Sequence, residues 1–276
     1  MDINNSIISN KIHNNHHTIY DCALDIIETT AKLNLIGEQN SPVGIVGHSF
    51  GGRCALQYVH TLKFNEYNQN NHSLNNHDDN SIKSNKVIIP PKCTWLLDTV
   101  PGKAHSSVSN VIQALTNINL ATIKSKQDLV TVLTSEHKID KSIANWMTTN
   151  LRKNNETNRF EFMFDLDVAK SVLNDFPKQD FMKLIEDTTS RNSNGSRNHQ
   201  NSNDSFHGSS QKVYLVMAGK NSAWTSDIVT DLQHLQQHQE LELVSLPNAG
   251  HWVHVDDLDG LMNAMEECFY DISIMR

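Results

Sequence analysis

The chain has 276 residues and a mass of 31.2 kDa, enough for one domain with a sizeable core. Hydrophobic residues make up 38% of it and the mean hydropathy is −0.47, and no run approaches the roughly 18 apolar residues of a membrane span. The formal net charge of −8 argues against a nucleic-acid-binding surface, because phosphate binding needs clustered Lys and Arg.

Residues 1–17 are rich in Asn and His and lack the apolar core of a signal peptide, so we expect a disordered tail. The four cysteines are scattered and form no Cys-x-x-Cys pair. This pattern favours buried thiols in a reducing compartment over disulfides or a metal site. We therefore expect an intracellular protein, in a compartment that the sequence does not specify.

Residues 18–33 carry apolar side chains at helical spacing, and residues 44–52 then read GIVGHSFGG. An apolar strand that runs into Gly-x-Ser-x-Gly and then a helix predicts a nucleophile elbow, the sharp turn that exposes a serine Oγ, here that of Ser49. Because the turn is tight, we expect a Cβ at Gly47 or Gly51 to collide with neighbouring backbone.

The later elements alternate between strand and helix. The pattern predicts buried strands at 93–98, 213–217 and 241–246, a helical region at 105–180 and a final helix at 256–270. Alternation of this kind predicts an α/β protein with a parallel sheet covered on both faces, and places functional residues at the carboxyl ends of the strands.

These elements predict five segments. After the tail comes the first part of the core at 18–102, which contains a low-complexity insertion at 65–86. A helical cap at 103–187 follows, then a low-complexity linker at 188–211 and the second part of the core at 212–276. Four apolar residues of the cap would line an acyl pocket or pack as ordinary helix core: Trp146, Met147, Phe160 and Phe162.

A serine hydroxyl needs a base within hydrogen-bond reach, and His251 is the best candidate. It follows the last predicted strand, where chain order Ser…acid…His places the base. His254 is the fallback. We expect His48, which precedes the serine, to pack beside the site, because neighbouring residues at a tight turn diverge.

The third member should be a carboxylate that orients His251. The turn after the strand at 213–217 reads GKNSAW and holds no acid. Asp98, at the end of the strand next to the elbow strand, can reach the same histidine and is preferred. Asp167 is the alternate acid, although a helix N-cap at the end of the cap region would also explain it.

The motifs GHSFGG, LDTVP, GKNS and PNAGHWVH resemble those of the α/β-hydrolase superfamily. More narrowly, from about residue 18 onward the chain resembles the branch of α/β-hydrolase domain-containing protein 11 and its bacterial acyl-esterase relatives. This resemblance implies a mostly parallel sheet of α/β-hydrolase type with a helical cap. It also implies a serine esterase or thioesterase that uses no metal and no organic cofactor. An acid at the position of Asp98 fits it, and Asp167 falls on another Asp of the family.

The sequence departs from the family pattern ahead of the elbow, where no His-Gly loop and no earlier strands occur. We therefore expect an N-terminally truncated sheet with an apolar edge on the elbow strand. Phe50 N–H would be the one oxyanion donor, and losing a second donor typically lowers the rate about 10²–10³-fold.

The sequence thus predicts a serine hydrolase for a small acyl-ester substrate. In it Ser49 is the nucleophile, His251 the base, and Asp98 the acid. The alternative is a catalytically impaired remnant or a partner-dependent protein without enzymatic activity.

Overall fold

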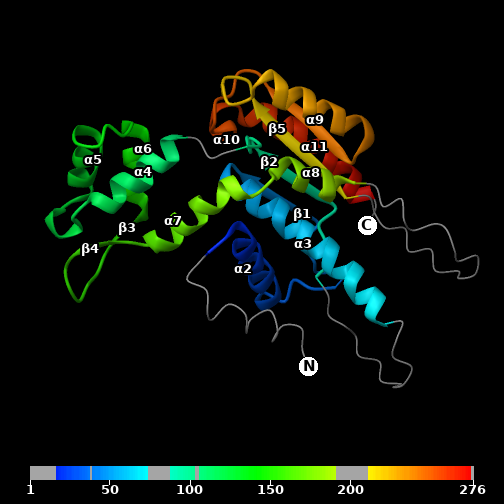
Figure 1. The fold of residues 1–276 in the computed structure, drawn as a ribbon, viewed down its shortest axis with the longest axis horizontal. Coiled ribbons are helices and arrows are strands. Elements are labelled where there is room, and N and C mark those ends of the chain that lie inside the picture. The colour runs from blue at the N-terminus through cyan, green and yellow to red at the C-terminus, as the bar shows by residue number, and fades with distance from the viewer. Residues whose placement is uncertain (1–16, 38, 74–87, 103–105, 191–210, 275–276) are drawn as a thin grey trace, which may run out of the picture. The chain divides into compact units, whose positions relative to one another are not determined.

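The computed structural model describes residues 17–37, 39–73, 88–102, 106–190 and 211–274 (Figure 1). The chain divides into two compact units. The sheet unit comprises Ile19–Gly102 and Asp180–Arg276, and the helical unit comprises Lys103–Gln179 together with Met1–Thr18. Each unit is described by itself below.

Four parallel strands form the sheet of the sheet unit, in the order β1-β2-β5-β6. They are β1 (Gly44–His48), β2 (Cys93–Leu97), β5 (Lys212–Ala218) and β6 (Leu241–Leu246). The predicted α/β class with a parallel sheet is confirmed. Because all four strands run the same way, their carboxyl ends lie along one edge of the sheet.

Helices cover both faces of this sheet (Figure 1). Trp95 and Leu97 face the side packed by α10 (Val253–Asp256) and α11 (Leu258–Ile274), whereas Leu96 between them faces the other side. That second side is packed by α3 (Phe50–Ser73), α8 (Phe181–Thr189) and α9 (Ser226–His238). The remaining helix, α2 (Ile19–Lys32), packs on α3.

The elbow strand β1 lies at an edge of the sheet, and among the described residues only β2 pairs with it. Val46 is 50% exposed, while its register partner Trp95 in β2 is fully buried. The expected apolar edge on the elbow strand is therefore present in the part of the chain that the structure describes.

The helical unit has its own apolar core. Its α-helices are α4 (Ser106–Asn117), α5 (Lys126–Ser135), α6 (Lys141–Met147) and α7 (Leu166–Asp175). Short 3₁₀ turns lie at η2 (Leu120–Thr122), η3 (Thr148–Asn150) and η4 (Phe176–Lys178). An antiparallel hairpin of β3 (Leu151–Lys153) and β4 (Phe160–Phe162) interrupts the helices and was not predicted.

Two boundaries differ from the sequence prediction. The cap was expected to reach residue 187, but α8 buries Phe181 and Ile185 against the sheet, so the helical unit ends at Gln179. The insertion was expected to begin at residue 65, but the elbow helix α3 continues to Ser73.

The remainder of that insertion, the tail up to residue 16 and most of the linker lie outside the described residues. None of the helices in the described part of the chain combines the length and the apolar character needed to cross a bilayer.

Candidate active site

The turn between β1 and α3 has the geometry of a nucleophile elbow. Ser49 connects the strand to the helix with a φ of 54°, a left-handed conformation that residues with a Cβ rarely adopt. Its N–H continues the sheet by donating to the main-chain O of Leu97 at 2.8 Å. Its main-chain O accepts from Gly52 N–H and from Thr99 Oγ1, each at 3.1 Å.

Two glycines make this turn possible, and one of them is not the one expected. A Cβ on Gly47 would lie 2.2 Å from the main-chain O of Gly51, so glycine is required there. A Cβ on Gly51 would meet nothing within 4 Å, so the expected clash at that position is wrong. The second close approach occurs at Gly52, where a Cβ would lie 1.9 Å from Thr99 Oγ1, because α3 begins against the chain that leaves β2.

Asp98 is the residue after β2, and its carboxylate is the most heavily bonded polar group of this region. Only 1% of the residue is exposed. Oδ1 accepts from Ala218 N–H at 3.1 Å and from Trp224 Nε1–H at 2.6 Å. Oδ2 lies 2.6 Å from Asn221 Nδ2 and 2.7 Å from His251 Nδ1. Four donors therefore fix the plane of one carboxylate.

These bonds also set the charge of Asp98. Burial by itself would raise the pKa of the carboxyl group. The hydrogen bonds from His251, Trp224, Asn221 and Ala218 together outweigh burial and hold the pKa below its ordinary value. Asp98 is therefore a buried carboxylate at neutral pH.

Asn221 and Trp224 are site residues that the sequence prediction missed. The turn after β5 was noted for its lack of an acid and for its family resemblance, yet it supplies two donors to the acid that follows the neighbouring strand. A buried carboxylate must be hydrogen-bonded. This requirement alone would have pointed to donor side chains in the turn that follows the adjacent strand.

His251 lies in the loop between β6 and α10. The loop is fastened by a bond from Lys220 N–H to Ala249 O at 3.0 Å and by one from Gly250 N–H to Asp256 Oδ2 at 2.8 Å. The His251 side chain is 43% exposed. Since its Nδ1 faces a carboxylate, that nitrogen carries a proton, and in the neutral ring Nε2 is left as the acceptor.

His48 joins the elbow to this loop. Its Nε2 lies 2.7 Å from the main-chain O of His251. Its ring centroid is 4.7 Å from that of His251 and 5.0 Å from those of Trp252 and His254. Packing beside the site was expected for His48, and the hydrogen bond was not. Although imidazoles gather here, no group of three or more His, Cys, Asp or Glu among the described residues is arranged to hold a metal ion.

Asp167, the alternate acid, lies in the first turn of α7 in the helical unit. Its side chain is 89% exposed and pairs with Lys170 Nζ at 2.9 Å. The N-cap of α7 is Asp165, whose Oδ1 accepts from Asp167 N–H at 2.8 Å. Asp98 is thus the acid that the structure brings into contact with His251, at 2.7 Å from Nδ1.

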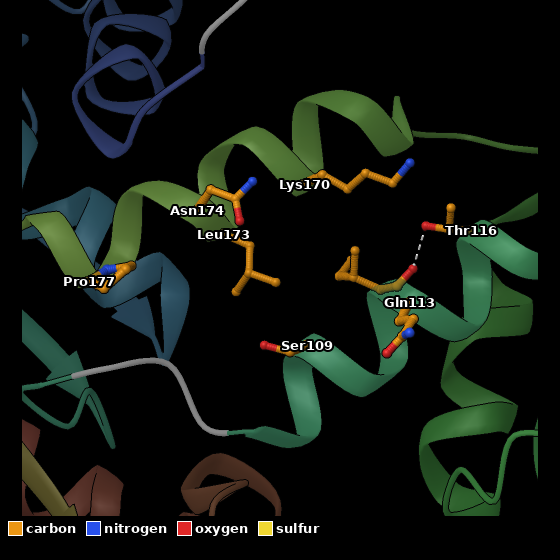
Figure 2. A pocket seen from close by; sticks show the side chains of 8 residues that line it. Ser109, Gln113, Thr116, Lys170, Leu173, Asn174 and Pro177 are labelled. Carbon is orange, nitrogen blue, oxygen red and sulfur yellow. Dashed lines mark hydrogen bonds between the residues drawn. The ribbon is translucent and has the colours of Figure 1, made fainter.

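The helical unit also contains a pocket of about 520 Å³ between α4 and α7. Figure 2 shows Leu173 of α7 pointing into this space opposite Ser109 and Gln113 of α4. None of the four residues suggested for an acyl pocket lines it: Met147, Phe160 and Phe162 pack in the apolar core of the unit, and Trp146 is 50% exposed. Of the two alternatives offered for them, helix-core packing fits Met147.

Comparison with solved structures identifies the fold. An esterase from a marine microorganism has a TM-score of 0.60 at 16% identity, with 92% of this chain matched to 78% of that one. E-2-(acetamidomethylene)succinate hydrolase has a TM-score of 0.56 at 12% identity, covering 91% of this chain and 73% of that one. The peroxisomal α/β-hydrolase Lpx1 of Saccharomyces cerevisiae has a TM-score of 0.53 at 12% identity, with 95% of this chain matched to 62% of that one.

No protein-family model matches the sequence, and no curated protein is significantly similar to it. The fold is of the α/β-hydrolase type. The narrower resemblance to the branch of α/β-hydrolase domain-containing protein 11 stays a prediction.

Proposed function

We propose that the protein is a serine hydrolase that cleaves carboxylic esters or thioesters. Ser49 acts as the nucleophile, His251 as the general base and Asp98 as the acid that orients it. The observation that carries the proposal is the 2.7 Å contact between Asp98 Oδ2 and His251 Nδ1, made by a carboxylate that is 1% exposed.

This contact supports the proposal because it determines which ring nitrogen can work. A proton held on Nδ1 leaves Nε2 to accept the hydroxyl proton of Ser49, and the ionised carboxylate stabilises the imidazolium that results. The left-handed backbone of Ser49, just ahead of α3, also supports the proposal, because such a turn holds a nucleophile exposed at a fixed place.

The reaction proceeds in two halves. Ser49 Oγ attacks the acyl carbon while its proton passes to His251 Nε2, and the tetrahedral intermediate then expels the alcohol or thiol, which leaves with that proton. Water next attacks the acyl-Ser49 ester, giving a proton to His251. Collapse of the second intermediate releases the acid and returns the proton to Ser49.

The negative charge of each intermediate falls on the former carbonyl oxygen. Phe50 N–H lies in the first turn of α3, directly after Ser49, where the helix directs a positive partial charge. Phe50 N–H is therefore the proposed oxyanion donor. One such donor is typically worth about 10²–10³ in rate.

A fluorophosphonate probe tests the proposal, because it reacts with an activated serine. We expect the purified chain to be labelled at Ser49 and to hydrolyse short p-nitrophenyl esters or acyl thioesters. Ser49→Ala should abolish labelling and lower kcat by roughly 10⁴-fold or more. Ser222→Ala, at an exposed serine of the same unit, is the matched control and should leave both unchanged.

Two outcomes would reject the proposal. One is labelling at a residue other than Ser49. The other is a chain that unfolds cooperatively in urea, and so is folded, yet remains unlabelled and inactive on both ester classes, which favours the alternative of a catalytically impaired or partner-dependent protein.

A further inference from the structure

His48 directly precedes Ser49, yet the reaction above gives it no part. It ends β1, at one edge of the four-stranded sheet. The loop that carries His251 follows β6, at the opposite edge, with β2 and β5 between them. A contact between His48 and that loop therefore links the two outer strands across the carboxyl end of the sheet.

The contact is a directed hydrogen bond. His48 Nε2 lies 2.7 Å from the main-chain O of His251, and because a carbonyl oxygen only accepts, Nε2 carries the proton and donates it. The ring is also flanked by the side chains of Trp252 and His254, each with its centroid at 5.0 Å. Both a hydrogen bond and ring packing thus join His48 to this loop.

His251 is consequently held at two points. Its Nδ1 contacts Asp98 at the end of β2, and its main-chain O accepts from His48 at the end of β1. With 43% of its side chain exposed, packing alone does little to fix the imidazole. Since His48 is bonded covalently to Ser49, the second restraint also fixes the base relative to the nucleophile.

We propose that His48 is a positioning residue, whose Nε2–H bond to the main chain of His251 keeps the imidazole of His251 within reach of Ser49 Oγ. This inference rests on the proposed function. The proton moves between Ser49 and His251, and His48 keeps its own.

The charge of His48 suits this role. Burial lowers its pKa, and the neighbouring His251 and His254 lower it further, against the opposing effects of the bond to His251 O and of Asp98. A neutral His48 adds no positive charge beside the imidazolium that forms on His251 during the reaction.

Two substitutions separate the hydrogen bond from ring packing. His48→Gln keeps an amide N–H donor at a similar reach and loses the ring, whereas His48→Phe keeps a ring and loses the donor. We expect His48→Phe to lower kcat roughly 10²-fold, as a base displaced by about 1 Å would. His48→Gln should stay within about fivefold of wild type, and KM within about twofold in both variants, because substrate binding is not disturbed.

A second measurement is independent of activity. The proton on His251 Nδ1, shared with Asp98, should give a far-downfield proton NMR signal that exchanges slowly with water. We expect the signal to persist in His48→Gln and to broaden or vanish in His48→Phe. If His48→Phe does not fold, His48→Asn replaces it, because its amide is too short to reach the same oxygen.

The outcomes distinguish the two proposals. A wild-type chain that the fluorophosphonate does not label defeats the proposed function, and the NMR signal still decides whether His48 holds His251. A labelled wild type with kcat and signal unchanged in His48→Phe overturns the inference alone. An active His48→Phe together with an impaired His48→Gln also overturns it, since that result would assign the effect to ring packing.

Discussion

Asp98 and Asp167 are the two carboxylates that the sequence offers as partners for His251, and their surroundings are opposite. Asp98, after a central strand of the sheet unit, is 1% exposed and receives four hydrogen bonds. Asp167, in the first turn of a helix, has a side chain that is 89% exposed and one partner, Lys170. The comparison shows that an acid becomes useful to a histidine when its neighbours fix its orientation and its charge together.

The sharpest way to break this comparison is to neutralise each acid in turn. We expect Asp98→Asn to lower kcat for a p-nitrophenyl ester roughly 10⁴-fold, because an amide no longer selects the working tautomer of His251. Asp167→Asn, its matched control, should stay close to wild type. Urea unfolding monitored by circular dichroism verifies that both variants are folded. Equal losses in the two variants would contradict the assignment of Asp98.

A smaller effect follows from weakening the surroundings of Asp98 while keeping the acid. Trp224→Phe removes one hydrogen bond to a charged group, and we expect kcat to fall about tenfold. The pKa of Asp98 should rise toward its ordinary value. Because a carboxylate with a lowered pKa stabilises the fold above its unfolded pKa and loses that contribution as pH falls through its folded pKa, acid unfolding should begin at a higher pH.

Acid unfolding of this variant is followed by Trp fluorescence or circular dichroism. Trp146→Phe, in the helical unit and 50% exposed, is the control and should leave the acid-unfolding curve where it is in wild type. An unchanged curve for Trp224→Phe would show that its Nε1–H bond does not help to hold the charge on Asp98.

The smallest expected effect extends the comparison to histidine. Burial lowers the pKa of His60 in α3. The charge of Asp187 opposes this shift, and the charge of Lys63 adds to it. His60 therefore binds its proton more readily in the unfolded chain than in the folded one. As pH falls through the ordinary histidine pKa of 6.5, His60 thus lowers the free energy of unfolding. His60→Gln should lose less stability than wild type between about pH 7 and 5. His234→Gln, at an exposed position of α9, should follow wild type in the same urea titrations.

Much of the sheet unit is predictable from sequence because its signals are local. The buried strands and the Gly-x-Ser-x-Gly turn each lie within ten residues, and chain order then leads to Asp98 and His251. What the sequence did not reveal depends on register. The bonds of Asn221 and Trp224 to Asp98 follow from which strand lies beside which, and the clash at Gly52 depends on how closely α3 approaches Thr99.

The helical unit was harder to predict for a related reason. β3 and β4 have three residues each, too few for an alternating pattern to be distinguished from helical spacing. α8 is an amphipathic helix like those of the helical unit. Its sequence therefore does not indicate that its apolar face packs on the sheet. Long-range packing decided both cases.

Ser49 and Asp98 each directly follow one of two neighbouring strands, and both adopt left-handed backbone conformations, with φ of 54° and 47°. Glycine adopts such angles without strain, so each position costs about 1–3 kcal/mol of stability for as long as it keeps its side chain. A lineage released from selection for hydrolysis would gain stability by drifting to glycine at position 49, whereas the four hydrogen bonds that Asp98 accepts oppose the same change at position 98. A serine kept at that strained position is therefore what the proposed role of nucleophile would require.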